Sequence, residues 1–179
     1  MKIFKTRNDL LDALPKNLFV VELGVFRGEF ASELHTRLQP KALKLVDIWK
    51  GEFGSGDKDG NNHTVVKNME SVYREIADKY QNIPEVEVIR DTTISFLLAC
   101  EDNSLDMVYV DADHSFQSVL TDLQLSLFKI KNGGILAGHD YIKNTQIAAA
   151  VDHFCGYYRQ EIIAVTQDGC PSFVIQVNK

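Results

Sequence analysis

The chain has 179 residues, of which 45% are hydrophobic and 25% charged, and its formal net charge is −6 at pH 7. This size and composition are typical of one globular domain, so we expect residues 1–179 to form a single domain. The acidic balance disfavours a nucleic-acid partner, and the apolar runs are too short for a membrane span or a signal peptide, which predicts a cytoplasmic protein.

Short apolar runs alternate with helical patterns along the chain, as in βαβ units that build a parallel sheet. We expect strands near residues 18–23, 42–47, 85–90, 105–111 and 133–138. Helical patterns lie near residues 6–14, 28–38, 64–80, 92–100, 115–130 and 145–156. The alternation predicts an α/β fold with a Rossmann-like, doubly wound sheet.

The C-terminal segment follows a different pattern. Two strand-like runs, residues 161–166 and 172–177, are separated by a short segment that contains Asp168-Gly169. Asp-Gly between apolar runs is a hairpin signal, so these two strands should be antiparallel. The sequence therefore predicts seven strands, mostly parallel, with a C-terminal antiparallel hairpin.

One long polar, glycine-rich stretch, residues 50–62, follows the second expected strand. A loop of this length in a small domain commonly closes over a ligand, so we interpret it as a substrate lid. The three cysteines, Cys100, Cys155 and Cys170, form no CxxC pair and are interpreted as reduced thiols without a special role.

The first two expected strands end in residues suited to a nucleotide-type ligand. Gly24 and Gly28 follow the first strand, where a backbone without side chains can approach a ligand at the start of a helix. Asp47 ends the second strand, where a carboxylate can accept both hydrogen bonds of a ribose diol. An alternative role for Asp47 is to cap the loop that follows it.

The phrase Glu22-x-Gly24-x-x-x-Gly28, followed by Asp47, resembles the cofactor signature of class I S-adenosylmethionine-dependent methyltransferases. The resemblance implies a seven-stranded sheet whose last two strands form an antiparallel hairpin. It also implies that these four residues bind S-adenosylmethionine, with Asp47 on the ribose. The residues that would face its adenine in such enzymes are Asp91 and Thr92.

A second cluster follows the fourth and fifth expected strands. Asp111, Asp113 and His114 come after one strand, and the pair His139-Asp140 comes after the next. Neighbouring parallel strands bring these ends to one edge of the sheet. Several carboxylates with no obvious basic partner, together with imidazole, favour a divalent cation, although the same residues could simply cap loops.

The runs Asp111-x-x-His114 and Gly138-His139-Asp140-Tyr141 resemble the metal-dependent O-methyltransferases of macrocin and cephalosporin biosynthesis. That resemblance implies metal ligation by Asp111, His139 and Asp140, with magnesium or another divalent cation. It makes His114 the candidate general base, so the expected catalytic residues are His114 and Asp111.

The sequence as a whole predicts a metal-assisted O-methyltransferase that acts on a hydroxylated small molecule, such as a sugar or a catechol-like compound. Two alternatives stay open at this point. One is a nicotinamide-dependent oxidoreductase, in which Asp47 would again bind a ribose. The other is a domain of the same fold that binds cofactor or a partner without catalysis. A homo-oligomer is compatible with either reading.

Overall fold

The computed structural model describes residues 1–50 and 68–179. The predicted lid, residues 50–62, lies outside this part of the chain except for Lys50. In the described part, no helix is both long and apolar enough to cross a membrane.

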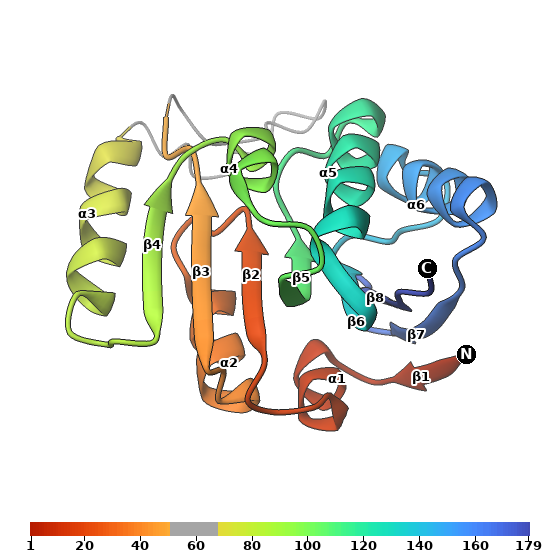
Figure 1. The fold of residues 1–179 in the computed structure, drawn as a ribbon, viewed down its shortest axis with the longest axis horizontal. Coiled ribbons are helices and arrows are strands. Elements are labelled where there is room, and N and C mark those ends of the chain that lie inside the picture. Colours follow the sequence, from red (N-terminus) through yellow and green to blue (C-terminus); the bar gives the residue numbers. More distant parts are fainter. Residues whose placement is uncertain (51–67) are drawn as a thin grey trace.

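The described residues form strands and helices in close alternation (Figure 1). The strands are β1 (Lys2–Phe4), β2 (Phe19–Leu23), β3 (Ala42–Asp47), β4 (Val86–Arg90), β5 (Leu105–Val110), β6 (Ile130–Gly138), β7 (Ile162–Thr166) and β8 (Phe173–Gln176). The helices are α1 (Arg7–Ala13), α2 (Glu29–Leu38), α3 (Met69–Tyr80), α4 (Thr93–Ala99), α5 (Phe116–Lys129) and α6 (Gln146–Tyr158).

The strands form one sheet in the order β1-β7-β8-β6-β5-β2-β3-β4. Strand β8 pairs antiparallel with both β6 and β7, whereas every other pairing is parallel. The α/β fold and its C-terminal antiparallel hairpin are therefore confirmed.

The described sheet has eight strands rather than the seven expected, because β1 adds to the edge beside β7. This strand has only three residues and largely exposed side chains, so it carries no apolar run. Its pairing with β7 depends on hydrogen bonds between backbone groups, so the pattern of hydrophobic residues does not predict it.

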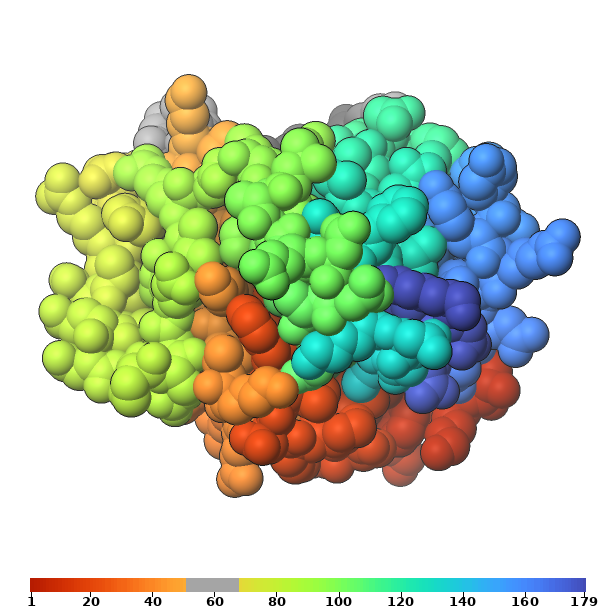
Figure 2. Space-filling view, viewed as in Figure 1, coloured from red at the N-terminus to blue at the C-terminus, as the bar shows by residue number. Residues whose placement is uncertain are grey.

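Helices cover both faces of the sheet. Helices α1, α2 and α3 pack on one face and α4, α5 and α6 on the other. Successive strand residues alternate between the two layers, as Val20 and Val21 do on β2. Figure 2 shows α4 and α5 over the near face, with the N-terminal residues along the lower edge.

The transition from α5 to β6 differs from the expectation. A helix was expected over residues 115–130 and a strand over 133–138, with Gly133 and Gly134 at its start, but the helix ends at Lys129 and β6 begins at Ile130. Ile130 is fully buried and pairs with Leu105, which starts the strand earlier. The glycines then lie inside β6, and a Cβ on Gly134 would come within 2.8 Å of the Asp106 carbonyl oxygen.

Candidate active site

A cavity of about 520 Å³ opens at the carboxyl ends of the parallel strands. This volume lies in the usual range for a small-molecule site. Eight of the ten residues predicted to form the site line it: Glu22, Gly24, Asp47, Asp91, Thr92, Asp111, His114 and His139. The other two do not line the cavity, but each is next in sequence to a lining residue: Gly28 precedes Glu29, and Asp140 follows His139.

The glycine loop after β2 adopts backbone conformations that favour glycine. Gly24 has φ +87° and Gly28 has φ +69°. Gly28 is the N-cap residue of α2 and supplies no side-chain cap, and Glu29 and Phe30 of the first helical turn line the cavity. A Cβ on Gly28 would come within 2.8 Å of Ile76 Cδ1.

Asp47 binds the backbone of the glycine loop directly. Its Oδ2 accepts hydrogen bonds from the amides of Val25 and Phe26, each at 2.9 Å, and its Oδ1 accepts from Trp49 at 2.8 Å. The capping role is thus present, although its main target is the glycine loop. A carboxylate has about four acceptor positions, so Asp47 keeps capacity for a ligand in the cavity that it lines.

Glu22 is a buried carboxyl group at the floor of the cavity, with 1% of its surface exposed. Its Oε2 has no hydrogen-bond partner among the described residues. Burial, and then the nearby Asp111 and Asp47 carboxylates, raise the pKa of Glu22 well above its ordinary value. An unpartnered buried acid of this kind fits a cationic or hydrogen-bond-donating ligand group.

Asp91 and Thr92 lie after β4, at the side of the cavity. Thr92 is the N-cap of α4 and accepts from the Ser95 amide at 3.1 Å. Asp91 Oδ1 accepts from the Thr92 amide at 2.7 Å, and Asp91 lines the cavity.

Three aromatic residues near the strand ends do not contribute to the cavity lining in the described part of the chain. Trp49 is fully buried and donates from Nε1 to the Phe26 carbonyl oxygen at 2.9 Å. Tyr141 donates to Asp152, and Phe116 contacts His153 edge-on. These contacts are ordinary packing around the site.

The acidic and histidine residues after β5 and β6 converge as predicted from the strand order. His139 Nδ1 lies 3.4 Å from Asp111 Oδ2 and 3.5 Å from Asp140 Oδ1. His114 Nε2 lies 3.5 Å from Asp140 Oδ2, and its side chain is 59% exposed. Asp111, His114 and Asp140 can each direct one ligand atom to a common point, so this group could hold a metal ion.

Arg7 is a cavity residue that sequence reasoning missed. Its guanidinium lies 4.5 Å from the centre of the Phe30 ring and 3.8 Å from Asp111 Oδ2. The carboxylate cluster therefore has a basic neighbour, contrary to the expectation. The sequence did hold one indication of this role. Arg7 is the first residue of α1, directly after the Thr6 N-cap, and a positive charge is unfavourable at a helix N-terminus unless another interaction compensates it.

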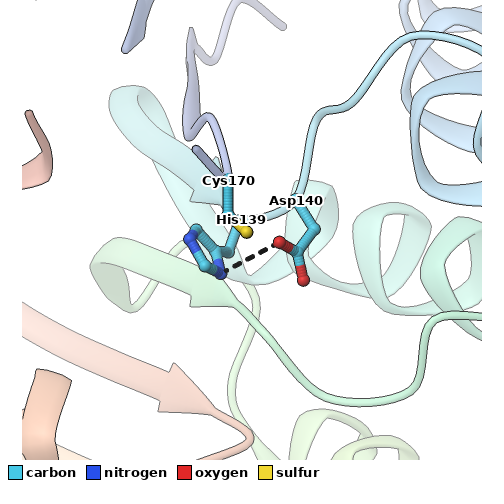
Figure 3. A group of neighbouring side chains, drawn as sticks. All are labelled: His139, Asp140 and Cys170. Carbon is cyan, nitrogen blue, oxygen red and sulfur yellow. Dashed lines mark ion pairs between the residues drawn. The ribbon is translucent and has the colours of Figure 1, made fainter. Parts of the chain in front are cut away.

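Cys170 is the second residue near the site that sequence reasoning did not place there. It belongs to the turn between β7 and β8, and its Sγ lies within 4.8 Å of ligand atoms on His139 and Asp140 (Figure 3). Burial and the Asp140 carboxylate raise the pKa of the Cys170 thiol. No sequence spacing links residue 170 to residues 139 and 140, so only the hairpin reveals this contact.

A family model described as a methyltransferase domain matches residues 21–141 of this chain. The match covers the glycine loop, Asp47, Asp111 and the His139-Asp140 pair. No protein of curated function matches the sequence.

Several solved structures share the fold. SMU.1697c from Streptococcus mutans, provisionally assigned as a methyltransferase and solved with S-adenosylhomocysteine, has a TM-score of 0.65, 15% identity and 94% coverage of both chains. The O-methyltransferase NovP has a TM-score of 0.64 and 16% identity over 90% of this chain and 72% of its own. Fibrillarin from Aeropyrum pernix, with bound S-adenosylmethionine, has a TM-score of 0.64 and 14% identity over 94% and 72%.

The low identities of these structures establish the fold, whereas the family match covers more than half of the chain. The predicted enzyme class is confirmed at this level, and the family assignment favours it over a nicotinamide-dependent oxidoreductase. The chain belongs to this methyltransferase family and is an S-adenosylmethionine-dependent methyltransferase.

Proposed function

We propose that this protein transfers a methyl group from S-adenosylmethionine to a hydroxyl of a small molecule, with help from a divalent cation. The acceptor class that fits is a vicinal diol or a catechol-like phenol. The observation that carries the proposal is the convergence of Asp111, His139 and Asp140 beside the cavity, next to the glycine loop.

The donor half of the site is formed by the loop after β2 and the end of β3. When bound, S-adenosylmethionine supplies an electrophilic methyl group on a sulfonium centre. Asp47 holds the Val25 and Phe26 amides and keeps acceptor capacity for a ribose hydroxyl. Glu22, with its unpartnered Oε2, accepts from the amino-acid end of the donor. Asp91 and Thr92 flank the adenine.

Arg7 adds a positive charge to this otherwise acidic cavity. Its position over Phe30 and beside Asp111 leaves donor N–H groups for an anionic ligand group, and the carboxylate of the donor is the group that fits.

The acceptor half is formed by the ends of β5 and β6. A divalent cation supplies Lewis acidity that lowers the pKa of an acceptor hydroxyl and orients it. The donors are carboxylate oxygens of Asp111 and Asp140 and the Nδ1 nitrogen of His139. Asp111 Oδ2 lies 3.4 Å from this nitrogen and Asp140 Oδ1 lies 3.5 Å from it. For bonds of about 2.0–2.2 Å to a tetrahedral ion, adjacent donors lie about 3.3–3.6 Å apart, so this pair of distances fits a metal.

His114 accepts the proton that leaves the acceptor hydroxyl. Its Nε2 faces Asp140 Oδ2 at 3.5 Å, so the carboxylate stabilises the imidazolium after Nδ1 has taken the proton. The side chain is largely exposed, which allows it to return the proton to water.

Two measurements test this proposal. S-adenosylhomocysteine is titrated calorimetrically into metal-free and metal-loaded protein, and methyl transfer to catechols and sugars is assayed with and without divalent cation. We expect binding in both states and transfer only with metal. Asp111→Asn should abolish transfer, whereas Asp78→Asn, at an exposed position on α3, should not.

Binding without transfer to any hydroxyl, in the presence of metal, would remove the hydroxyl acceptor from the proposal. Equal transfer with and without a chelator would remove the cation from the proposal.

A further inference from the structure

The turn between β7 and β8 brings a thiol to the end of β6. His139, Asp140 and Cys170 each offer one ligand atom, and these atoms lie within 4.8 Å of one another. Figure 3 shows the Cys170 sulfur beside the imidazole and carboxylate, with His139 and Asp140 in ion-pair contact. The three donors are a nitrogen, an oxygen and a sulfur.

Backbone contacts hold this turn in place. The Tyr141 amide donates to the Pro171 carbonyl oxygen at 2.8 Å, which joins the residue after Asp140 to the residue after Cys170. One step farther along, Gly138 pairs with Phe173 in the β6–β8 ladder. The position of the thiol is therefore set by the sheet on both sides of the group.

The donor set is unsuited to magnesium. Mg²⁺ requires near-octahedral oxygen coordination, whereas Zn²⁺ and Co²⁺ bind Cys, His and carboxylate ligands together in a tetrahedral site. The 3.5 Å between His139 Nδ1 and Asp140 Oδ1 matches one edge of such a tetrahedron, and three protein ligands leave its fourth position open for an acceptor oxygen.

We propose that Cys170 is a metal ligand and that the site selects a thiophilic divalent cation such as Zn²⁺ over Mg²⁺. This inference rests on the metal part of the proposed function and is independent of the identity of the methyl acceptor. The thiolate changes both the identity of the cation and the anchoring of the β7–β8 turn to β6.

A competing role for Cys170 is a simple thiol contact with Asp140, with no metal bond. The two roles differ in spectroscopy, because only direct ligation gives a thiolate-to-metal charge-transfer band with Co²⁺. They also differ in selectivity, because a thiol that stays outside the coordination sphere confers no preference for Zn²⁺ over Mg²⁺.

The test is a Co²⁺ titration of the metal-free full-length protein, followed by ultraviolet absorption. We expect one equivalent of Co²⁺ to produce the thiolate band, Zn²⁺ to bleach it, and a large excess of Mg²⁺ to leave it unchanged. Cys170→Ser should remove the band and weaken Zn²⁺ binding on the order of 10–100-fold. Cys100→Ser, at the far end of α4, should keep both.

A band that survives Cys170→Ser, Co²⁺ binding without a band, or displacement by Mg²⁺ would overturn the inference. Titration of S-adenosylhomocysteine into the same samples shows whether Cys170→Ser is folded and whether the donor half works. Wild-type protein that binds S-adenosylhomocysteine but gives no thiolate band would thus overturn the metal inference and leave the methyltransferase assignment intact.

Discussion

Gly24 and Asp111 are in such close backbone contact that a Cβ on Gly24 would lie 2.0 Å from the Asp111 carbonyl oxygen. The Asp111 amide donates to the Leu23 carbonyl oxygen at 2.8 Å, which fixes the two strand ends side by side. The donor loop and the proposed metal-bearing strand therefore share one rigid junction.

Gly24→Ala should be strongly destabilising, because alanine must adopt φ +87° and also displace backbone. We expect a loss of at least about 2 kcal/mol in the free energy of unfolding and much weaker S-adenosylhomocysteine binding. Gly133→Ala is the matched control, since Gly133 has φ +80° but no atom within 4 Å of its Cβ position. Urea denaturation of both should separate the two effects, and equal losses would rule out the close approach as the cause.

Asp47→Asn should loosen the glycine loop. Asparagine has one acceptor oxygen. Either the Val25 and Phe26 amides, which both donate to Oδ2, or the Trp49 amide, which donates to Oδ1, would therefore lose the acceptor. We expect a stability loss of about 1–3 kcal/mol and at least about tenfold weaker S-adenosylhomocysteine binding, measured by denaturation and calorimetry. An unchanged affinity would show that Asp47 only supports the loop.

His114→Ala should reduce turnover by about 10²–10⁴-fold and leave S-adenosylhomocysteine affinity nearly unchanged, because the residue acts on the acceptor proton. His153→Ala, at an exposed position on α6, is the control and should retain activity. Comparable losses of turnover and cofactor affinity would contradict the assignment of His114 as general base.

Asp111→Ala and Asp140→Ala should each abolish metal-dependent methyl transfer, because each removes an oxygen donor from the group around His139. Metal content after dialysis, measured alongside activity, checks this. If both variants respond to added cation as the wild type does, the ligand assignment is wrong.

Asp122 should make stability depend on pH. Burial raises the pKa of Asp122 to about 6, although Thr93 donates to it at 2.6 Å. The native state then holds this proton more tightly than the unfolded state, so the stabilisation is complete below about pH 4 and is lost as pH rises through about 6. The wild type should lose free energy of unfolding on the order of 3 kcal/mol over this pH range, and Asp122→Asn should not.

Urea denaturation at several pH values measures this slope. Asp78→Asn, an exposed control, should keep the wild-type slope. A slope unchanged by Asp122→Asn would place the responsible proton on another group.

The sequence determined which strand ends carry chemistry, because each buried parallel strand is a short apolar run that ends in glycine, acid or histidine. From the order of those ends it was possible to predict a doubly wound sheet and to bring Asp111 together with His139 and Asp140, whereas the class I arrangement was implied by the resemblance of the glycine-loop motif to methyltransferases. The terminal hairpin followed from Asp168-Gly169 between two apolar runs.

Only the tertiary structure decided which residues join the site from elsewhere. Arg7 enters from the first helix, and Cys170 enters from a hairpin turn whose register depends on pairing with β6. Both contacts span long separations in sequence and leave no periodic pattern. They arise from how the edge strand β1, its neighbour β7 and the antiparallel β8 pair beside the central strands, and local sequence does not encode that geometry.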